Sequence, residues 1–425
     1  MHDPKLLRTE PERVKEGVRA KGQDDGLVDR WLALDESRRG LVTGVEKLKS
    51  DRNAASREIG AKRKAGGDAS AEQEQERVRA LGEEIKSLDD RVREADAELE
   101  GLSLVIPNLP DSDVPRGDAS ANHVVRTWEN PVLHPFPART HDDLGTALGL
   151  LDFERATRMS GPGFAVFLGL GARLERALIH FMIELHVREH GYTEVSTPYL
   201  VKPSAAQGTG QLPKLAEDMY RTDTDGLYLI PTAEVSITNL YAEETIDEQR
   251  LPIYHVGYSP CFRREAGSYG KDTKGLTRVH QFDKVEMVKF THPDRSEAEH
   301  EMLTANAEAV LQRLGLAYRV VLLASGDLSF AASKCYDIEV WAAGVGRWLE
   351  VSSCSNFRDF QARRAGIRMK PAGGGKTGYV HTLNGSGLAL PRTVIALLEN
   401  NQTERGTVRI PEPLRPYLGG LAEVE

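Results

Sequence analysis

Two long segments near the start of the chain carry apolar residues at a seven-residue period. The first row runs through residues 27–55 and consists of Leu27, Leu34, Leu41, Leu48 and Ala55. The second row runs through residues 78–99 and consists of Val78, Ile85, Val92 and Leu99. A glycine-containing turn at residues 65–70 separates the two segments. Heptads on both sides of a short turn predict an antiparallel helical hairpin with a coiled-coil seam over about residues 27–102.

The pattern changes after this hairpin. The proline-rich segment IPNLPDSDVPRG, residues 106–117, ends the helix and marks a boundary. Residues 171–190 have the apolar spacing of an amphipathic helix, and the chain beyond them alternates short apolar segments with turns. This pattern predicts antiparallel strands with helices near residues 295–315 and 391–400. We expect an α+β protein with an amino-terminal domain over residues 1–110 and a second, antiparallel-sheet domain over residues 111–425.

Composition places the chain among ordinary globular proteins. Of its 425 residues, 40 % are hydrophobic and 28 % are charged. No apolar run approaches the roughly 18–20 residues that span a bilayer, and the acid-containing start does not resemble a signal peptide. The three cysteines are too far apart to indicate a disulfide framework or a metal site. We therefore predict a cytoplasmic protein that does not associate with membranes.

Charge is distributed unevenly between the two helical segments. Residues 43–67 contain seven basic residues against three acidic ones, whereas residues 71–100 contain eleven acidic residues against five basic ones. One interpretation is that the two helices attract each other. The other is that the basic residues near the turn bind the phosphates of a nucleic acid, which the net charge of −9 does not exclude.

The most informative stretch is FRREAGSYGKDTKGLTRVHQFDKVE, residues 262–286. Arg263 and Glu265 alternate along a predicted strand, and so do Arg278, His280, Phe282 and Glu286 after a glycine- and lysine-rich loop. An arginine can bind phosphate through a bidentate fork, and an aromatic ring can stack on a base. The stretch favours a platform for a polyanion and a flat ring, although an exposed hairpin with solvated charges has the same pattern.

This stretch resembles motif 2 of the class II aminoacyl-tRNA synthetases, in the form that the seryl-tRNA synthetases carry. Residues 168–198, beginning LGLGARLERALIHF, look like motif 1, and LNGSGLALPRTVIALLEN, residues 383–400, looks like motif 3. The segment PTAE, residues 231–234, resembles the serine-binding loop. The resemblance covers nearly the whole chain to about residue 410 and implies a class II catalytic domain preceded by a long coiled-coil arm.

The resemblance implies an ATP site. Arg263 and Arg392 would be the catalytic pair, acting on the α-phosphate and on the β- and γ-phosphates, and Phe282 would stack on adenine. Glu265 would contact the adenine amino group or the backbone of its own motif. Glu350 and Ser353 would hold Mg²⁺, which prefers hard oxygen ligands. The full set of expected ATP-binding residues is Arg263, Arg264, Glu265, Val279, Phe282, Glu350, Val351, Ser352, Ser353 and Arg392.

The resemblance also implies a site for L-serine. Its members would be Thr232, Ala233, Glu234, Arg263, Glu286, Asn384 and Ser386. The serine ammonium group calls for a carboxylate and a hydroxyl, which Glu234 and Thr232 would supply. The serine hydroxyl calls for a polar pocket, for which Glu286 and Ser386 are candidates. Thr232 can equally be an N-cap before a helix that starts at Ala233, and both roles can coexist.

The implied activity is the two-step charging of tRNA(Ser), and of tRNA(Sec) as a further substrate, with serine and ATP. The implied assembly is a homodimer built partly on the motif 1 helix, and the implied sheet has six or seven antiparallel strands. In the arm, the basic residues that would meet tRNA are Arg52, Arg57, Lys62, Arg63 and Lys64. Two alternatives stay open: an amino-acid ligase that loads a carrier protein, and a non-catalytic relative that binds or regulates.

One further motif is misleading. Residues 373–377, GGGKT, suggest a phosphate-binding loop of the G-x-x-x-x-G-K-[ST] type, but Lys370 stands where the first glycine is needed. The residues that follow are strand-like rather than helical. We therefore predict a loop at residues 373–377 and no P-loop nucleotide site.

Overall fold

The chain folds into two units, which we describe separately. The computed structural model describes residues 1–64, 68–266 and 274–425, without the side chains of residues 62–64 and 68–71. One unit consists of His2–Arg19 and Gln23–Ile106, and the other of Met1, Ala20–Gly22 and Pro107–Glu425. We call them the arm unit and the catalytic unit. Among the described residues, no helix combines the length and the apolar character that crossing a membrane requires.

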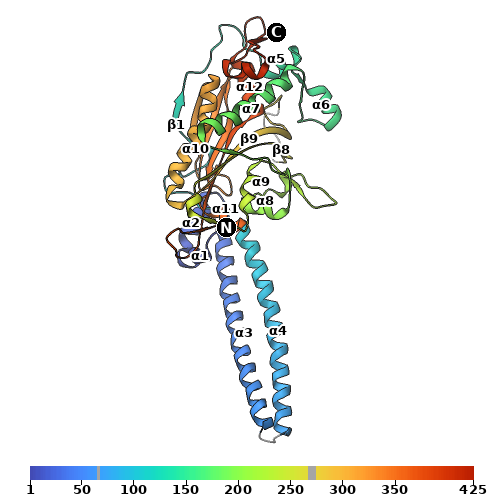
Figure 1. Cartoon of the computed structure of the whole chain (residues 1–425), viewed down its shortest axis with the longest axis vertical. Coiled ribbons are helices and arrows are strands. Elements are labelled where there is room, and N and C mark those ends of the chain that lie inside the picture. Colours follow the sequence, from blue (N-terminus) through green and yellow to red (C-terminus); the bar gives the residue numbers. More distant parts are fainter. Residues whose placement is uncertain (65–67, 267–273) are drawn as a thin grey trace. The chain divides into compact units, whose positions relative to one another are not determined.

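The arm unit is built on two long antiparallel helices. These are α3 (Gly26–Lys64) and α4 (Asp68–Val105), which lie side by side in Figure 1, after the short helices α1 (Pro4–Thr9) and α2 (Pro11–Ala20). Ala55, Ile85 and Leu99 of the two heptad rows are buried in the seam, together with Trp31, Val45 and Ala95. Arg38, seven residues after Trp31, turns its guanidinium to Asp96 of α4, with 2.6 Å between Nε and Oδ1. The predicted helical arm is confirmed, and residues 65–67 of its turn lie outside the described residues.

The catalytic unit is built on an eight-stranded sheet with the order β1-β10-β11-β12-β15-β9-β8-β4. Its strands are β1 (His123–Trp128), β4 (Thr193–Glu194), β8 (Ile253–Phe262), β9 (Gln281–Thr291), β10 (Tyr318–Leu322), β11 (Lys334–Ala342), β12 (Arg347–Asn356) and β15 (His381–Ala389). The pairings are antiparallel except that β4 runs parallel to β8. The antiparallel-sheet class is confirmed. Among the described residues, the seven strands from β1 to β8 pair antiparallel, within the expected six or seven, and the two-residue β4 adds a parallel eighth strand.

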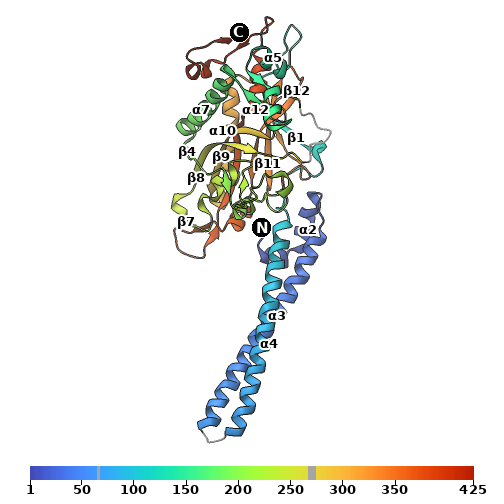
Figure 2. The ribbon, with the colours of Figure 1, turned by 90° about the vertical axis from the view of Figure 1, so that its right-hand side faces the viewer.

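Helices cover both faces of this sheet (Figures 1 and 2). On one face, Val285 and Met287 of β9 join the core formed with α7 (Leu170–His190), α10 (Ser296–Leu314) and α12 (Leu390–Asn400). On the other face, Val288 and Phe290 pack with α9 (Glu234–Thr238) and α11 (Phe360–Ala365). Because side chains alternate along a strand, Lys284 and Glu286 also belong to this second face, on which the functional cavity opens.

The remaining elements surround the sheet. The helices are α5 (His141–Ala147), α6 (Phe153–Ser160) and α8 (Pro203–Thr209). Short strands pair as β2 (Leu151–Asp152) with β3 (Val166–Phe167), β5 (Leu200–Val201) with β6 (Tyr228–Leu229), β16 (Val408–Arg409) with β17 (Glu423–Val424), and β13 (Arg368–Lys370) with β14 (Gly378–Tyr379) and β7 (Thr245–Asp247). The GGGKT segment lies in the loop between β13 and β14 and no helix follows it, as predicted.

The paired strands at the informative stretch are shorter than the alternation predicted. Strand β8 ends at Phe262 and β9 begins at Gln281, so that Arg263, Glu265, Arg278 and His280 lie beyond the strands. One backbone bond, from Arg263 N to His280 O at 2.8 Å, continues the pairing. Glu265 then adopts a φ of 52°, a left-handed conformation that strand geometry excludes. The predicted basic loop falls largely on residues 267–273, outside the described residues.

Candidate functional site

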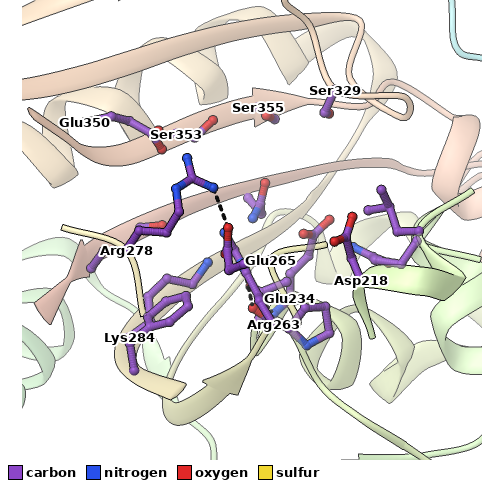
Figure 3. A pocket seen from close by; sticks show the side chains of 18 of the residues that line it. Asp218, Glu234, Arg263, Glu265, Arg278, Lys284, Ser329, Glu350, Ser353 and Ser355 are labelled. Atoms are coloured by element: carbon purple, nitrogen blue, oxygen red, sulfur yellow. Dashed lines mark hydrogen bonds and ion pairs between the residues drawn. The ribbon is translucent and has the colours of Figure 1, made fainter. Parts of the chain in front are cut away.

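A cavity of about 570 Å³ opens on the second face of the sheet. Figure 3 shows Glu350, Ser353, Ser355 and Ser329 along one wall, facing Glu234, Arg263 and Lys284 across it. The predicted site residues that line the cavity are Thr232, Glu234, Arg263, Glu265, Val279, Phe282, Glu350, Val351, Ser353, Asn384, Ser386 and Arg392. Segments far apart in the sequence therefore contribute to one site.

One end of the cavity is organised around a fully buried carboxylate, that of Glu286 on β9. The Thr232 hydroxyl donates to its Oε2 at 2.7 Å, and the Asn384 amide on β15 donates to its Oε1 at 2.8 Å. Lys284, two residues away on the same strand face, forms an ion pair with it. Glu286 thus fixes a hydroxyl and an amide that face the cavity. A buried carboxylate with this many partners is held in one orientation.

Thr232 has two roles at once. Its hydroxyl also accepts a hydrogen bond from Glu234 N at 3.3 Å. Helix α9 begins at Glu234, one residue later than predicted, and Ala233 occupies the N-cap position. The prediction of Thr232 as the N-cap residue is therefore wrong. Because one hydroxyl can donate and accept together, its contacts with Glu234 N and with Glu286 coexist.

The Glu234 side chain is buried beside the same network. Gln361 Nε2 of α11 donates to Glu234 Oε1 at 2.6 Å. Gln361 is itself oriented, because its Nε2 also donates to Thr209 O at 3.1 Å and its Oε1 accepts from the Thr382 hydroxyl at 2.7 Å. Burial, and next the negative charge of Glu286, raise the pKa of Glu234 to about 7, against the opposing effect of the Gln361 hydrogen bond. A cation that binds here would stabilise the ionised carboxylate.

Two arginines also line the cavity. Arg263 lies over the Phe282 ring, with 5.0 Å from the guanidinium carbon to the ring centroid, and its Nε donates to Pro231 O at 3.2 Å. Arg392, near the start of α12, donates from Nη1 to Glu350 O at 2.7 Å and to Glu350 Oε2 at 3.2 Å. Both arginines are partly exposed to the cavity. Their guanidinium groups are therefore placed to meet an anion there.

Glu265 does not face the cavity as a free carboxylate. It forms an ion pair with Arg278, which lies in the segment before β9 (Figure 3). This contact brings together the two polar ends that follow β8 and precede β9. An incoming base or phosphate would meet the pair rather than either side chain alone.

A bulge in β12 aims Glu350 and Ser353 at the same cavity. Ile338 pairs with Ser352 but Glu339 pairs with Glu350, so Val351 is the extra residue. Without the bulge, residues three apart in a strand would face opposite sides. Two hard oxygen donors therefore lie together. No group of three or more His, Cys, Asp or Glu residues in the described parts of the chain has the geometry of a metal site.

The sequence relatives agree with this architecture. Residues 217–401 match the model for the tRNA synthetase class II core domain (G, H, P, S and T), and residues 1–110 match the model for the seryl-tRNA synthetase N-terminal domain. The serine–tRNA ligase of Carboxydothermus hydrogenoformans is 52% identical over 420 residues, which cover 99% of this chain and 98% of the relative. That of Chloroflexus aurantiacus is 50% identical over 425 residues, all of both chains.

The chain belongs to the seryl-tRNA synthetase family. A solved member, the seryl-tRNA synthetase from Pyrococcus horikoshii complexed with ATP, has a TM-score of 0.94 to this structure at 37% sequence identity. The superposition covers 100% of this chain and 99% of that one. The prediction of family, drawn from four motifs and the arm, is confirmed.

Some residues expected from the seryl-tRNA synthetase resemblance do not line the cavity. Ala233 and Ser352 are buried, and the Ser352 hydroxyl donates to Ser386 O at 2.7 Å. Arg264 is exposed, and its described contact with this region is from backbone N to Asp218 O at 2.8 Å. Glu286 lies behind the cavity wall. The buried residues Ala233, Ser352 and Glu286 can support a ligand only through their neighbours, or through backbone atoms.

The tRNA-binding residues predicted for the family's arm are only partly described. Arg52 is partly exposed and Arg57 is exposed on α3, and neither has an ion-pair partner among the described residues. Lys49 does pair with Asp89 across the helices, at 3.2 Å. Attraction between the helices therefore applies to Lys49. Phosphate binding by Arg52 and Arg57 stays a prediction. The side chains of Lys62, Arg63 and Lys64 lie outside the described residues.

Several site residues of this seryl-tRNA synthetase family member were not predicted. Lys284 pairs with Glu286, Gln361 donates to Glu234, and Asp218 Oδ1 accepts from Ala266 N at 2.9 Å. Asp337 of β11 pairs in register with Ser353, and burial raises its pKa well above the usual range, with a further rise from the Glu350 carboxylate. The even spacing of Lys284 and Glu286 on one strand was the available signal for Lys284. Nothing local marks the other three.

Proposed function

We infer that the chain catalyses the two-step serylation of tRNA(Ser). In the first step, a serine carboxylate oxygen attacks the α-phosphorus of ATP, the new O–P bond forms, and pyrophosphate leaves. In the second step, a terminal ribose hydroxyl of the tRNA attacks the serine carbonyl carbon and AMP leaves. The observation that carries this inference is the joint placement of buried carboxylates and arginines in one cavity of a seryl-tRNA synthetase family member.

The serine end of the cavity fits a small zwitterion with a hydroxyl group. Glu234 and Thr232 would bind the ammonium group, and Arg263 would bind the carboxylate. Asn384 and Ser386 line the space left for a short polar side chain. Glu286 would act from behind, by fixing Thr232 and Asn384, so that the site loses satisfied hydrogen bonds if a ligand lacks the hydroxyl.

The phosphate end fits adenylate formation without a protein base. Positioning and charge neutralisation supply most of the acceleration in such phosphoryl chemistry. Arg263 would meet the α-phosphate and Arg392 the terminal phosphates. Each arginine would exchange a present contact, with the Phe282 face or with Glu350, for a phosphate oxygen.

Mg²⁺ is the metal that the donor set at the β12 bulge fits best. A carboxylate and a hydroxyl, with the remaining positions left to phosphate oxygens and water, match its preference for hard oxygen ligands and few protein contacts. Bound there by Glu350 and Ser353, the ion would neutralise charge on the phosphates.

Two partner assignments rest on the family resemblance. A homodimer built partly on α7 follows from motif 1, and sedimentation equilibrium that gives the monomer mass at micromolar concentration would contradict it. Charging of tRNA(Sec) follows from the shared long variable arm that the family recognises. It is tested by aminoacylation of that tRNA beside tRNA(Ser).

The function itself is tested by aminoacylation with radiolabelled serine, ATP and purified tRNA(Ser). We expect serine to become attached to tRNA(Ser) and not to a tRNA with a short variable arm. Transfer to a carrier protein instead of tRNA would favour the carrier-loading alternative. Failure of both transfer and adenylate formation would favour a non-catalytic relative.

A further inference from the structure

The segment Lys274–Leu276, which leads from the loop after β8 back toward β9 and which we call the return limb, contacts two consecutive residues at the start of α5. Lys274 Nζ lies 2.9 Å from Asp142 Oδ2. Leu276 N donates to His141 Nε2 at 3.0 Å. Between them, Gly275 has a φ of 63° and lies so close to the imidazole that a Cβ atom would overlap it. The limb thus has an ion pair, a close backbone approach and a hydrogen bond within three residues.

The imidazole of His141 is oriented by a buried carboxylate at the end of α12. His141 Nδ1 lies 2.8 Å from Glu399 Oε1, and both residues are buried, with exposures of 1% and 0%. Glu399 also accepts from His141 N at 2.9 Å, from Gly344 N at 2.8 Å and from Val345 N at 3.0 Å.

These contacts select one tautomer of the His141 imidazole, with the proton on Nδ1 and the lone pair on Nε2. An ionised carboxylate only accepts hydrogen bonds, so the shared proton sits on Nδ1. The lone pair of Nε2 is then available to Leu276 N–H. A second proton on Nε2 would remove this acceptor, because two donors would then face each other.

The residues that His141 holds continue directly into the cavity wall. Leu276 and Thr277 both line the cavity. Thr277 O accepts from Arg392 Nε at 3.3 Å, and Arg392 Nη1 donates to Glu350 O at 2.7 Å. A continuous series of contacts therefore joins the buried imidazole to the arginine proposed for the terminal phosphates. His141 itself does not line the cavity.

We propose that His141 is a positioning residue for adenylate formation. It fixes Leu276 N and, through the Thr277 carbonyl, sets the orientation of Arg392. The proposal rests on the proposed function, since Arg392 matters only if phosphates bind beside it. The alternative is that His141 merely fills space in the core next to Glu399.

Substitution of His141 by asparagine and by glutamine distinguishes a positioning role from a space-filling role. His141→Asn places an amide near Nδ1, which keeps a donor for Glu399 but removes the acceptor for Leu276. His141→Gln places an amide oxygen near Nε2, which restores that acceptor. The matched control is His123→Asn, the same substitution at an exposed residue of β1. All variants are made in the full chain.

The readout is ATP–pyrophosphate exchange with kcat and the KM values for ATP and serine measured separately. Misplacing a catalytic group by about 1 Å can lower a rate by about 10²-fold. We expect His141→Asn to lower kcat by about 10- to 100-fold, with the KM for serine unchanged within about twofold. His141→Gln should recover most of the loss, and His123→Asn should behave as the parent. Equal losses in the Asn and Gln variants, or losses that follow thermal stability alone, would overturn the proposal.

A second measurement does not depend on activity. Hydrogen–deuterium exchange of a peptide that contains Leu276 and Thr277 should be faster in His141→Asn than in the parent or in His141→Gln. If the parent shows no serine-dependent exchange of pyrophosphate, the proposed function fails, and this measurement still tests the hold on Leu276. Unchanged protection in His141→Asn would show that the imidazole does not hold the limb.

Discussion

The arm and the cavity use charge in opposite ways. In the arm, Arg38–Asp96 and Lys49–Asp89 pair on the surface between helices, with side chains that are one third to one half exposed. In the cavity, Glu286 is fully buried and has three side-chain partners. Exposed pairs contribute little and are screened by salt, whereas buried, paired charges are held rigidly, and removing one partner is strongly destabilising.

This contrast separates the two halves of the reaction. A rigid, satisfied network suits the selection of a small amino acid, for which one unpaired hydrogen bond decides between substrates. Exposed basic residues on a long helix suit a large polyanion, for which many weak interactions with phosphates add up. We therefore expect changes in the cavity to affect serine activation, and changes in the arm to affect only the transfer to tRNA.

The largest effect is expected from the cavity. Arg263→Ala should lower ATP–pyrophosphate exchange by about 10²–10³-fold, because the variant has no guanidinium to stabilise the charge of the transition state. The fold should survive, since the side chain is partly exposed. Arg250→Ala, at an exposed residue outside the cavity, is the control and should leave exchange unchanged. Near-normal exchange in Arg263→Ala would remove this residue from the reaction centre.

Removing the arm should produce a large effect in one assay alone. In a variant with residues 30–100 replaced by a short Gly-Ser linker, serine activation should stay within about twofold of the parent, because every residue that lines the cavity lies between residues 209 and 392. Charging of tRNA(Ser) should fall by about 10²-fold or more, because the variant can no longer bind several phosphates of the tRNA at once. Charging at the parent rate would exclude the arm from the mechanism.

The pKa of Glu234 gives a smaller, pH-dependent effect. With a pKa of about 7 in the free protein, Glu234 is mostly protonated below pH 7, and serine must displace a proton to bind. The KM for serine should therefore rise by about tenfold per pH unit below 7 and level off above 8. Glu234→Gln should have a higher KM with a flat pH profile. A parent profile that is flat between pH 6 and 8 would contradict the assignment.

The smallest effect concerns the exposed bases of α3. Replacing Arg52 and Arg57 by Gln should reduce the slope of log K for tRNA(Ser) binding against log salt by about 0.9 for each phosphate that the arm no longer neutralises. Replacing Arg38 and Lys49, which pair with α4, is the matched control and should leave the slope unchanged. If the two double variants lower arm stability equally and neither changes the slope, the basic segment serves the helix pair alone.

The same contrast explains what the sequence could predict. The arm follows from local periodicity, because heptads encode a seam without reference to distant residues. The cavity depends on interactions that join separate segments, such as Gln361 with Glu234, and on side chains such as Lys284 that turn toward a buried carboxylate. Most of the residues that the family resemblance implied for the ligand sites line the cavity, but it did not indicate that Glu286 would lie behind the wall.

Local backbone geometry accounts for the remaining differences. The alternation of Arg263 and Glu265 suggested a continued strand, but Glu265 turns into the left-handed region and pairs with Arg278. The bulge at Val351 brings Glu350 and Ser353 to one face, and no periodic pattern signals it.

Ala20–Gly22 belongs to the catalytic unit because Lys21 Nζ donates to Ser329 O at 2.8 Å and to Ala332 O at 2.5 Å. Local sequence patterns cannot predict a hydrogen bond between residues about 300 positions apart.

The measurement that tests the central claim most directly is ATP–pyrophosphate exchange of the unmodified chain with serine, threonine and alanine in turn, without tRNA. The account predicts exchange with serine and weak exchange with threonine, against which the cavity discriminates by size alone. It predicts a preference for serine over alanine of up to about 10⁴–10⁵-fold, because alanine leaves the polar groups fixed by Glu286 unpaired. Equal exchange with alanine and serine would contradict it.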